Sequence, residues 1–322
     1  MTKDDTTEPS RSRERKDLHA QLDELRQRNA ADESGETLRG ALDRHERIAG
    51  QNRGERRGKG RARRQPAALL FEDPPGQPKV PPPHVKLEEA VSGVELDGPD
   101  GVKSFLVETR TRDLVEVHHI DATFREALSA ESGALRQRIP VLRKATGVVP
   151  EDFLFMDIET TGLGSSPLFL IGAMRWANGG FEIRQHFARD YSEEAAVIAA
   201  FAGACQRETI LVTFNGKTFD VPYVRTRAVA TGVPIDLNVP HIDLLHVARG
   251  VWQGRLPNCK LQTLESRICG RTRRGDIPGN LIPDAYHAYV RTCNAWQMVE
   301  VLRHNVLDLV TMADIMTRLP VP

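Results

Sequence analysis

The stretch FLFMDIETTGLG, residues 153–164, joins an apolar run directly to two acidic residues. The apolar run predicts a buried β-strand. Asp157 and Glu159 are two positions apart, so both carboxylates point to the same side of a strand. Neighbouring carboxylates repel each other and resist burial. The turn residues that follow put the acids near the end of the strand. We therefore expect either a strand end that is open to water or a cation that binds between the acids.

Composition excludes several classes of protein. The 322 residues contain 44 Lys and Arg and 44 Asp and Glu, which matches neither a polyanion mimic nor a uniformly basic binder. The four cysteines have no CxxC spacing, which argues against a zinc ribbon or a redox motif. Scattered thiols favour a reducing, cytoplasmic location. The charged N-terminus lacks a secretory apolar region, and no apolar run reaches the roughly 18 residues that span a bilayer.

Local composition predicts three parts. Residues 1–66 are rich in charge and glycine and are expected to be a disordered tail, because they cannot bury enough apolar surface to offset their ordering entropy. Residues 67–148 begin with a proline-dense linker and continue as a small accessory region. A β-hairpin is expected around the Asp-Gly turns of residues 93–111, and a helix is expected near residues 123–139. Residues 149–322 form the main domain.

The main domain shows the pattern of an α/β fold. Three apolar runs, FLFMDIE, PLFLIGAMRW and GFEIRQHFA, predict three antiparallel strands, and Asn178-Gly179-Gly180 is a hairpin signal between the last two. Helices and strands then alternate, and a long helix closes the chain. We therefore predict a mixed sheet flanked by helices.

Two further acids belong to the same pattern. Asp220 follows the apolar strand TILVTF, and Asp308 lies on the last helix with His304 one turn earlier. Hard oxygen ligands from separate elements suit two Mg²⁺ or Mn²⁺ ions, which would stabilise both the attacking and the leaving oxygen of a phosphodiester. A nearby histidine is suited to accept the proton of the attacking water. The alternatives are a first-turn helix residue for Asp220 and a surface pair for His304 and Asp308.

These motifs resemble the DEDD exonuclease superfamily, the DnaQ-like branch of the ribonuclease H-like fold. The carriers are DIETTG, FNGKTFD and HNVLD. Together with HIDLLHVARGVW and CKLQTLESRICGRTRRGDIPGN, they are similar to the YprB-type ribonuclease H-like family. The resemblance covers residues 151–319, and its specificity lies in the whole set of motifs.

The resemblance implies a two-metal nuclease, with a 3′–5′ exonuclease acting on single-stranded DNA or RNA ends as the expected activity. It implies Asp157, Glu159, Asp220 and Asp308 as metal ligands. His304 would be the general base, although the family places a histidine five residues before the last acid or a tyrosine four before it. The alternative is a ribonuclease H-like nucleic-acid-binding module with weak or no turnover. A hydrolase of small phosphate esters is a third possibility.

Several other residues have two interpretations each. Asp243 is either a helix cap or a substrate contact, and Asn215 either forms a turn or binds substrate. Asn305 either forms a hydrogen bond within the site or faces another direction, because it is one residue after His304 on the helix. The basic run RTRRGDIPG, residues 271–279, is either an exposed loop or a phosphate-tracking segment. Trp252 and Tyr286 are either core residues or base-stacking residues, and core packing is the expectation for both.

The basic run between Arg53 and Arg64 is expected to raise the affinity for nucleic acid without setting sequence preference. Each Lys or Arg that contacts a phosphate releases counterions, so deletion of residues 53–64 should lower the salt dependence of binding. The measurement is the slope of log affinity against log salt concentration for a single-stranded oligonucleotide. An unchanged slope would show that this run does not touch the backbone.

Overall fold

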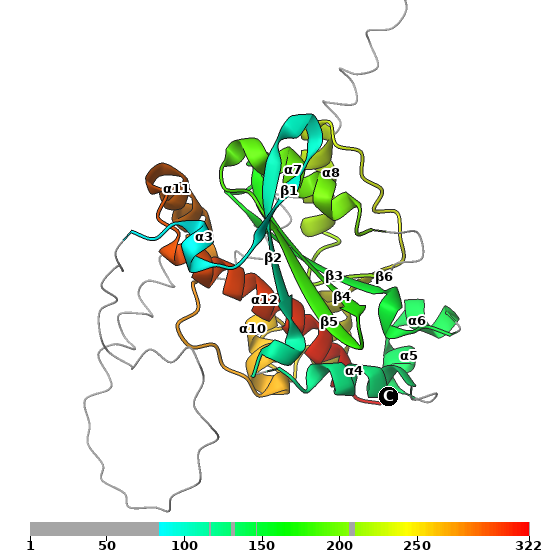
Figure 1. Cartoon of the computed structure of the whole chain (residues 1–322). Coiled ribbons are helices and arrows are strands. Elements are labelled where there is room, and N and C mark those ends of the chain that lie inside the picture. Colours follow the sequence, from blue (N-terminus) through cyan, green and yellow to red (C-terminus); the bar gives the residue numbers. More distant parts are fainter. Residues whose placement is uncertain (1–83, 116, 130–132, 146, 206–209, 322) are drawn as a thin grey trace, which may run out of the picture. The chain divides into compact units, whose positions relative to one another are not determined.

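The structure, a computed structural model, describes residues 84–115, 117–129, 133–145, 147–205 and 210–321. The predictions for the tail 1–66 and for the linker before residue 84 lie outside these residues. The described part is an α/β fold: a mixed sheet of seven strands with helices on both faces, as the sequence predicts (Figure 1). In these ranges, no helix is both long and apolar enough to cross a membrane.

The sheet has the strand order β1-β2-β5-β4-β3-β6-β7. The pairs from β1 to β3 are antiparallel, while β6 and β7 run parallel to β3. The strands are β1 Val94–Asp97, β2 Lys103–Arg110, β3 Phe153–Thr160, β4 Leu168–Ala177, β5 Gly180–Phe187, β6 Ile210–Thr213 and β7 His241–Asp243. The strand that carries the two acids, β3, therefore lies between the antiparallel and the parallel parts.

The helices surround this sheet, and the last one is the longest of those described (Figure 1). They are α3 Leu87–Ala90, α4 Ile120–Ser129, α5 Ala134–Arg138, α6 Pro140–Lys144, α7 Glu194–Ala202, α8 Asp220–Thr231, α9 Leu244–Trp252, α10 Leu261–Leu264, α11 Ile282–Thr292 and α12 Trp296–Thr317. A π-helical turn, Glu265–Cys269, follows α10 directly.

The alternation of side chains along β3 divides the core between two sides of the sheet. Leu154 and Met156 pack in one apolar cluster with residues of α7 and α8. Phe153 and Phe155 pack in a second cluster with residues of α4, α9 and α12. Asp157 continues the side of Phe153 and Phe155, so the end of β3 presents its acids toward α12.

The accessory region before the main domain belongs to the same sheet. The predicted hairpin is present as β1 and β2, and β2 pairs antiparallel with β5. The helix predicted near residues 123–139 is present as α4 and α5. Phe124 of α4 is fully buried against Phe153, Phe155 and Phe181, with ring centroids 5.0 to 5.8 Å apart. Residues well before 149 thus complete the core beneath β3.

The hairpin predicted between β4 and β5 has the expected geometry. Asn178 and Gly179 both have positive φ, 52° and 82°, and Ala177 pairs with Gly180. Two residues of this kind match the twist of the flanking strands. The core interpretation also holds for Trp252, which is 7% exposed, and for Tyr286, whose ring stacks on Phe169 at 3.9 Å.

Truncation of Phe124 tests whether the accessory region is part of the folded core. Phe124→Ala should lower the free energy of unfolding by about 3–5 kcal/mol, because it leaves a cavity among three aromatic rings. Val229→Ala, at a side chain that is 82% exposed, is the matched control and should change it by less than about 0.5 kcal/mol. Denaturant unfolding measures both. A loss below about 1 kcal/mol for Phe124→Ala would contradict this packing.

Candidate active site

The end of β3 places Asp157 and Glu159 between the sheet and α12. Asp157 lies opposite Gly172 of β4, and the strand pairing shifts by a bulge after Glu159. Both side chains are partly buried. Partial burial contradicts neither of the two expectations, an open strand end or a bound cation, and the buried part of each negative charge needs compensation from within the site.

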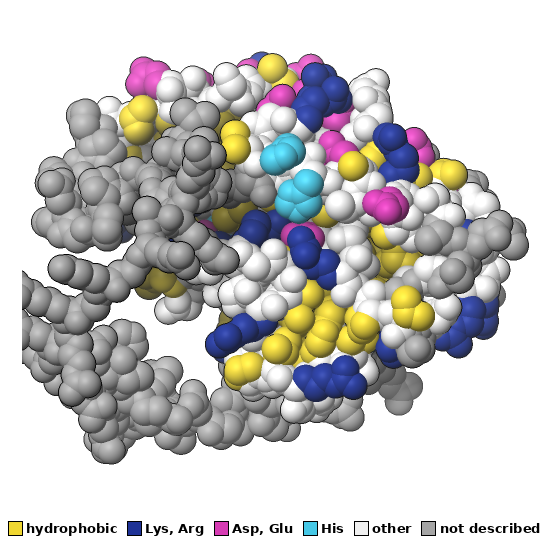
Figure 2. Space-filling view, turned by 90° about the horizontal axis from the view of Figure 1, so that it is seen from below, with side chains coloured by type: hydrophobic (Ala, Val, Ile, Leu, Met, Phe, Trp, Pro, Cys, Tyr) yellow, Lys and Arg dark blue, Asp and Glu magenta, His cyan; other side chains and the backbone are white. Residues whose placement is uncertain are grey.

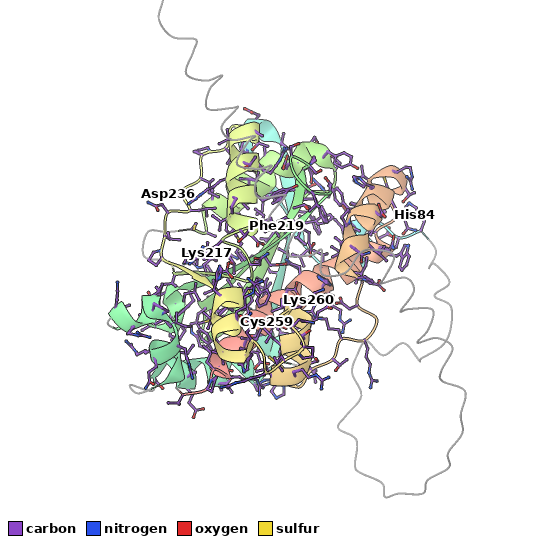
Figure 3. All side chains as sticks on the ribbon, turned by 180° about the vertical axis from the view of Figure 1, so that it is seen from behind. His84, Lys217, Phe219, Asp236, Cys259 and Lys260 are labelled. Atoms are coloured by element: carbon purple, nitrogen blue, oxygen red, sulfur yellow. The ribbon has the colours of Figure 1, made fainter. Side chains whose placement is uncertain are left out.

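Asp220 reaches the same region from the start of α8, the helix that follows β6. It is the first residue of α8 and is only 5% exposed. The connection from β6 is a tight turn in which Asn215 has φ 68°. Figure 3 shows Lys217 and Phe219 on this connection, directly before Asp220. The turn fixes where α8 begins and thereby positions the Asp220 carboxylate.

Asp243 holds this turn and has the structural one of its two predicted roles. Its carboxylate accepts hydrogen bonds from the backbone N–H groups of Asn215, at 2.9 Å, and of Lys217, at 3.0 Å. It also caps α9 by accepting from the N–H of Leu245 at 3.0 Å. Asn215 likewise has the turn role. Asp243 thus joins the β6–α8 turn to the end of β7.

α12 supplies Asp308 and His304 at i and i−4. His304 is 6% exposed, so the alternative of an ordinary surface pair is wrong. Its Nε2 lies 3.5 Å from Asp308 Oδ2. The charge of Asp308 is, after burial, the largest influence that raises the pKa of Asp157. The charged side chains of α12 and β3 are therefore close enough to influence each other.

Burial and mutual repulsion shift the acids of the site. Burial, followed by the charges of Asp308, Glu159 and Asp220, holds the pKa of Asp157 well above its usual range. Burial also raises the pKa of Glu159 to about 8, and the positive charge of His304 opposes this rise. The pKa of Asp220 rises to about 7 for the same first reason, against hydrogen bonds from backbone N–H groups. Carboxylates in this state favour a neutralising cation.

Asn305 fixes Asp157, a role that its direction on the helix did not predict. Its Nδ2 donates to Asp157 Oδ2 at 2.8 Å, and its Oδ1 accepts from Gln185 Nε2 at 2.9 Å. A Cβ on Gly172 would lie only 2.1 Å from Asn305 Oδ1, so any other residue at this position would collide with the amide. Glycine at this position therefore lets α12 approach the sheet closely enough to reach Asp157.

The sequence presents residues 271–279 as a basic loop that is either exposed or tracks phosphates. Two of its arginines, Arg271 and Arg273, instead form ion pairs with acids of the chain. Arg271 pairs with Asp314 at 3.1 Å and with Glu265 at 3.3 Å. Arg273, whose side chain is 6% exposed, pairs with Glu265 at 2.6 Å and also with Asp308. The expectation of an exposed loop is wrong for Arg271 and Arg273, because both meet buried acids of the π-helical turn and of α12. Arg274 is exposed. The phosphate-tracking role stays a prediction.

Asp276 lies in the same segment and is a site residue that the sequence interpretation missed. Both of its carboxylate oxygens lie 3.0 Å from His304 Nδ1, and Oδ2 lies 3.2 Å from Arg273 Nη1. The only signal in the sequence is an acid within the basic run RTRRGDIPG, and nothing in that pattern indicates which helix it faces.

A cavity of about 450 Å³ opens beside these ion pairs. Its lining comes from the 271–278 segment together with α10 and the π-helical turn. The lining residues are Gln262, Glu265, Ser266, Arg271, Thr272, Arg273, Gly275, Asp276, Ile277 and Pro278. The outer side of the segment that contacts Asp308 and His304 is therefore accessible to solvent.

The residues fit a divalent cation by their chemistry. Carboxylate oxygens are the ligands that Mg²⁺ and Mn²⁺ prefer, and burial together with neighbouring acids raises the pKa of three of the four acids. The fourth, Asp308, is paired with Arg273 and contacts His304. Within the described ranges, no three His, Cys, Asp or Glu side chains are already arranged to hold a metal ion.

The described basic side chains are dispersed on the face that Figure 2 shows. On the face that Figure 2 shows, the described Lys and Arg side chains stand in separate groups between hydrophobic and uncharged side chains. A phosphate backbone on this face would meet single cations instead of a continuous basic stripe.

The chain belongs to the RNase_H superfamily, whose family model RNase_H_2 matches residues 154–320. It is similar to the "Uncharacterized protein YprB" of Bacillus subtilis (strain 168), with 32% identity over 176 residues. The match covers 53% of this chain and 42% of that relative, so the chain spans less than half of the relative's length. These two findings confirm the YprB-type ribonuclease H-like domain that the motifs indicated.

Two solved structures are distantly similar in fold. A family B DNA polymerase from the hyperthermophilic archaeon Pyrobaculum calidifontis aligns with a TM-score of 0.42 and 18% identity, over 53% of this chain and 25% of the polymerase. E. coli Exonuclease I in complex with a dT13 oligonucleotide aligns with a TM-score of 0.30 and 17% identity, over 47% of this chain and 43% of the exonuclease.

Neutralisation of Asp157 should stabilise the protein in the absence of divalent cations. Asp157→Asn removes one of several buried like charges and keeps an oxygen for Asn305, so the free energy of unfolding at pH 8 in EDTA should rise by about 1–2 kcal/mol. The measurement is denaturant or thermal unfolding.

The control is Asp243→Asn, because Asp243 is 3% exposed and its carboxylate accepts three backbone hydrogen bonds. An amide N–H₂ cannot accept one of them, so this variant should lose about 1–3 kcal/mol. Two changes of the same sign would contradict the assignment of repulsion to one acid and of capping to the other.

Proposed function

We propose that this protein is a metal-dependent nuclease that hydrolyses nucleic-acid phosphodiester bonds, as a 3′–5′ exonuclease on single-stranded ends. The observation that carries the proposal is the electrostatic coupling of four carboxylates from β3, α8 and α12 on a ribonuclease H superfamily fold. Structural acids are normally paired or exposed, whereas a cluster of mutually perturbed acids is typical of a functional site.

The four carboxylates have the role of metal ligands in this proposal. Asp157, Glu159, Asp220 and Asp308 would hold two Mg²⁺ or Mn²⁺ ions. Such ions stabilise the charge on the attacking and the leaving oxygen of a phosphodiester. The surrounding residues keep the acids in place: Asn305 orients Asp157, and the Asp243-bound turn orients the start of α8.

His304 has the role of general base in the proposal. Its Nε2 faces Asp308, whereas Nδ1 is engaged by Asp276. Burial lowers the pKa of His304, but the hydrogen bond that His304 donates to Asp276 and the charges of Asp308 and Glu159 outweigh it and raise the pKa. A ring nitrogen that faces the acids and carries a proton readily is suited to take the proton of an attacking water.

A second candidate function is a nucleic-acid-binding module without turnover. The observation that favours it is the ion pair between Arg273 and Asp308, because this pair occupies one of the four carboxylates with a cation of the chain itself. The two functions differ in their response to metal. A nuclease needs the carboxylate of Asp308 for a divalent ion, while a binding module keeps its pair with Arg273.

Hydrolysis of end-labelled oligonucleotides tests the proposal. With Mg²⁺ or Mn²⁺, the wild-type chain should shorten single-stranded DNA or RNA stepwise from the 3′ end. Asp157→Ala should reduce the rate by at least about 10³-fold, because a metal ligand is lost. Asp113→Ala, at an exposed acid outside the site, is the control and should keep the wild-type rate.

A circular single strand and a 3′-blocked strand decide whether cleavage needs a free end. Cleavage of the circle would replace exonuclease by endonuclease action. Titration of Mn²⁺ by calorimetry separates the two functions. Strand binding with neither cleavage nor a heat of metal binding supports the binding module, and equal activity of wild type and Asp157→Ala contradicts the nuclease.

A further inference from the structure

The 271–278 segment is tied to α12 over about three turns of the helix. Asp276 contacts His304, Arg273 contacts Asp308, and Arg271 contacts Asp314. His304, Asp308 and Asp314 lie on one long helix, and the first two belong to the proposed active site. A segment that only closed the chain between the π-helical turn and α11 would not need to match these acids and this histidine one by one.

The contact between Asp276 and His304 defines the orientation of the imidazole. Both carboxylate oxygens stand 3.0 Å from Nδ1, and the two side chains are 9% and 8% exposed. A neutral imidazole carries its proton on only one nitrogen. A carboxylate at Nδ1 selects the tautomer with the proton on Nδ1 and leaves the lone pair on Nε2. Nε2 is the nitrogen that lies 3.5 Å from Asp308 Oδ2.

Arg273 holds Asp276 in this position. Its Nη1 is 3.2 Å from Asp276 Oδ2, its Nε is 2.6 Å from Glu265 Oε2, and its Nη2 pairs with Asp308. One planar guanidinium therefore fixes the relative positions of Asp276, which contacts Nδ1 of His304, and Asp308, which lies near Nε2. Planar, multidentate pairs of this kind restrict geometry more than a single ammonium contact does.

We propose that Asp276 is a positioning residue, which holds His304 with Nε2 directed into the acid cluster. This inference rests on the proposed function. In the hydrolytic step, the oxygen of water forms a bond to phosphorus and the P–O3′ bond breaks. The proton of the water passes to His304 Nε2, and the departing 3′ oxygen takes a proton from solvent. Asp276 keeps its negative charge throughout and stabilises the imidazolium that results.

Nitrogen NMR of the ring tests the positioning without any reaction. In the full chain labelled with ¹⁵N-histidine and free of divalent ions, His304→Gln identifies the signals of His304. At a pH at which the ring is neutral, the wild type should show the tautomer with the proton on Nδ1. Asp276→Ala should shift the ring to the tautomer with the proton on Nε2. A wild-type ring protonated on Nε2, or no change in the variant, would overturn the proposal.

Kinetics test the consequence for the reaction. Asp276→Ala should lower kcat on an oligonucleotide by about 10- to 100-fold and leave KM within about twofold, since partners of this kind orient a group without touching substrate. Asp276→Glu keeps a carboxylate for Nδ1–H and should recover part of the loss, whereas Asp276→Asn removes the charge and should not. Asp284→Ala, at an exposed acid on α11, is the matched control and should match the wild type.

The two readouts separate failure of this inference from failure of the proposed function. If the wild type hydrolyses no strand but its ring carries the proton on Nδ1 and loses it in Asp276→Ala, the nuclease fails and the positioning role of Asp276 stands. If the wild type is active and Asp276→Ala lowers only the melting temperature with kcat unchanged, the nuclease stands and the positioning role is overturned.

Discussion

Negative charge gathers at the carboxyl end of β3, between the sheet and α12, and the surrounding structure compensates it. Asp157 and Glu159 lie there by the alternation of the strand, and Asp220 and Asp308 add two more carboxylates. Buried like charges destabilise a fold unless they are paired or hydrogen-bonded. The compensating groups are an amide on Asp157, a guanidinium on Asp308 and a histidine between Asp308 and Asp276. The apolar part of the domain holds these groups close enough to act.

The contact between α12 and the sheet depends on shape as much as on charge. Gly172 leaves the space that Asn305 fills, and Gln185 of β5 binds the other end of the same amide. Below this polar contact, Phe153 and Phe155 pack with Val310 and Phe124 in one cluster. The polar contact and the apolar cluster therefore both hold α12 in the same position against the sheet. The accessory region contributes to this packing through Phe124. A site that needs acids from three elements requires this agreement, since small shifts would separate them.

The 271–278 segment connects charge compensation to chemistry. Its arginines and Asp276 meet acids and a histidine spread over about three turns of α12, and a cavity lies beside it. The same side chains that neutralise Asp308 thereby set the direction of His304. The histidine spacing in HNVLD, which departs from the two well-known patterns of the resembling superfamily, is accompanied by a carboxylate partner from a separate segment.

The sequence by itself determined the α/β fold, the succession of strands along the chain from residue 153 onward and the β4–β5 turn, and it predicted four acids as a site. These features rest on local rules: period-two alternation, turn residues and acids placed at element ends. Only the tertiary structure decided the partners of those acids. Asn305, Arg273 and Asp276 carry no local signal, because what each does depends on a residue between about 28 and 150 positions away that packing brings near. Arg271 and Arg273 were predicted to be exposed for the same reason. A charged residue is expected on the surface unless another element supplies a buried counter-charge, and the sequence does not show that partner.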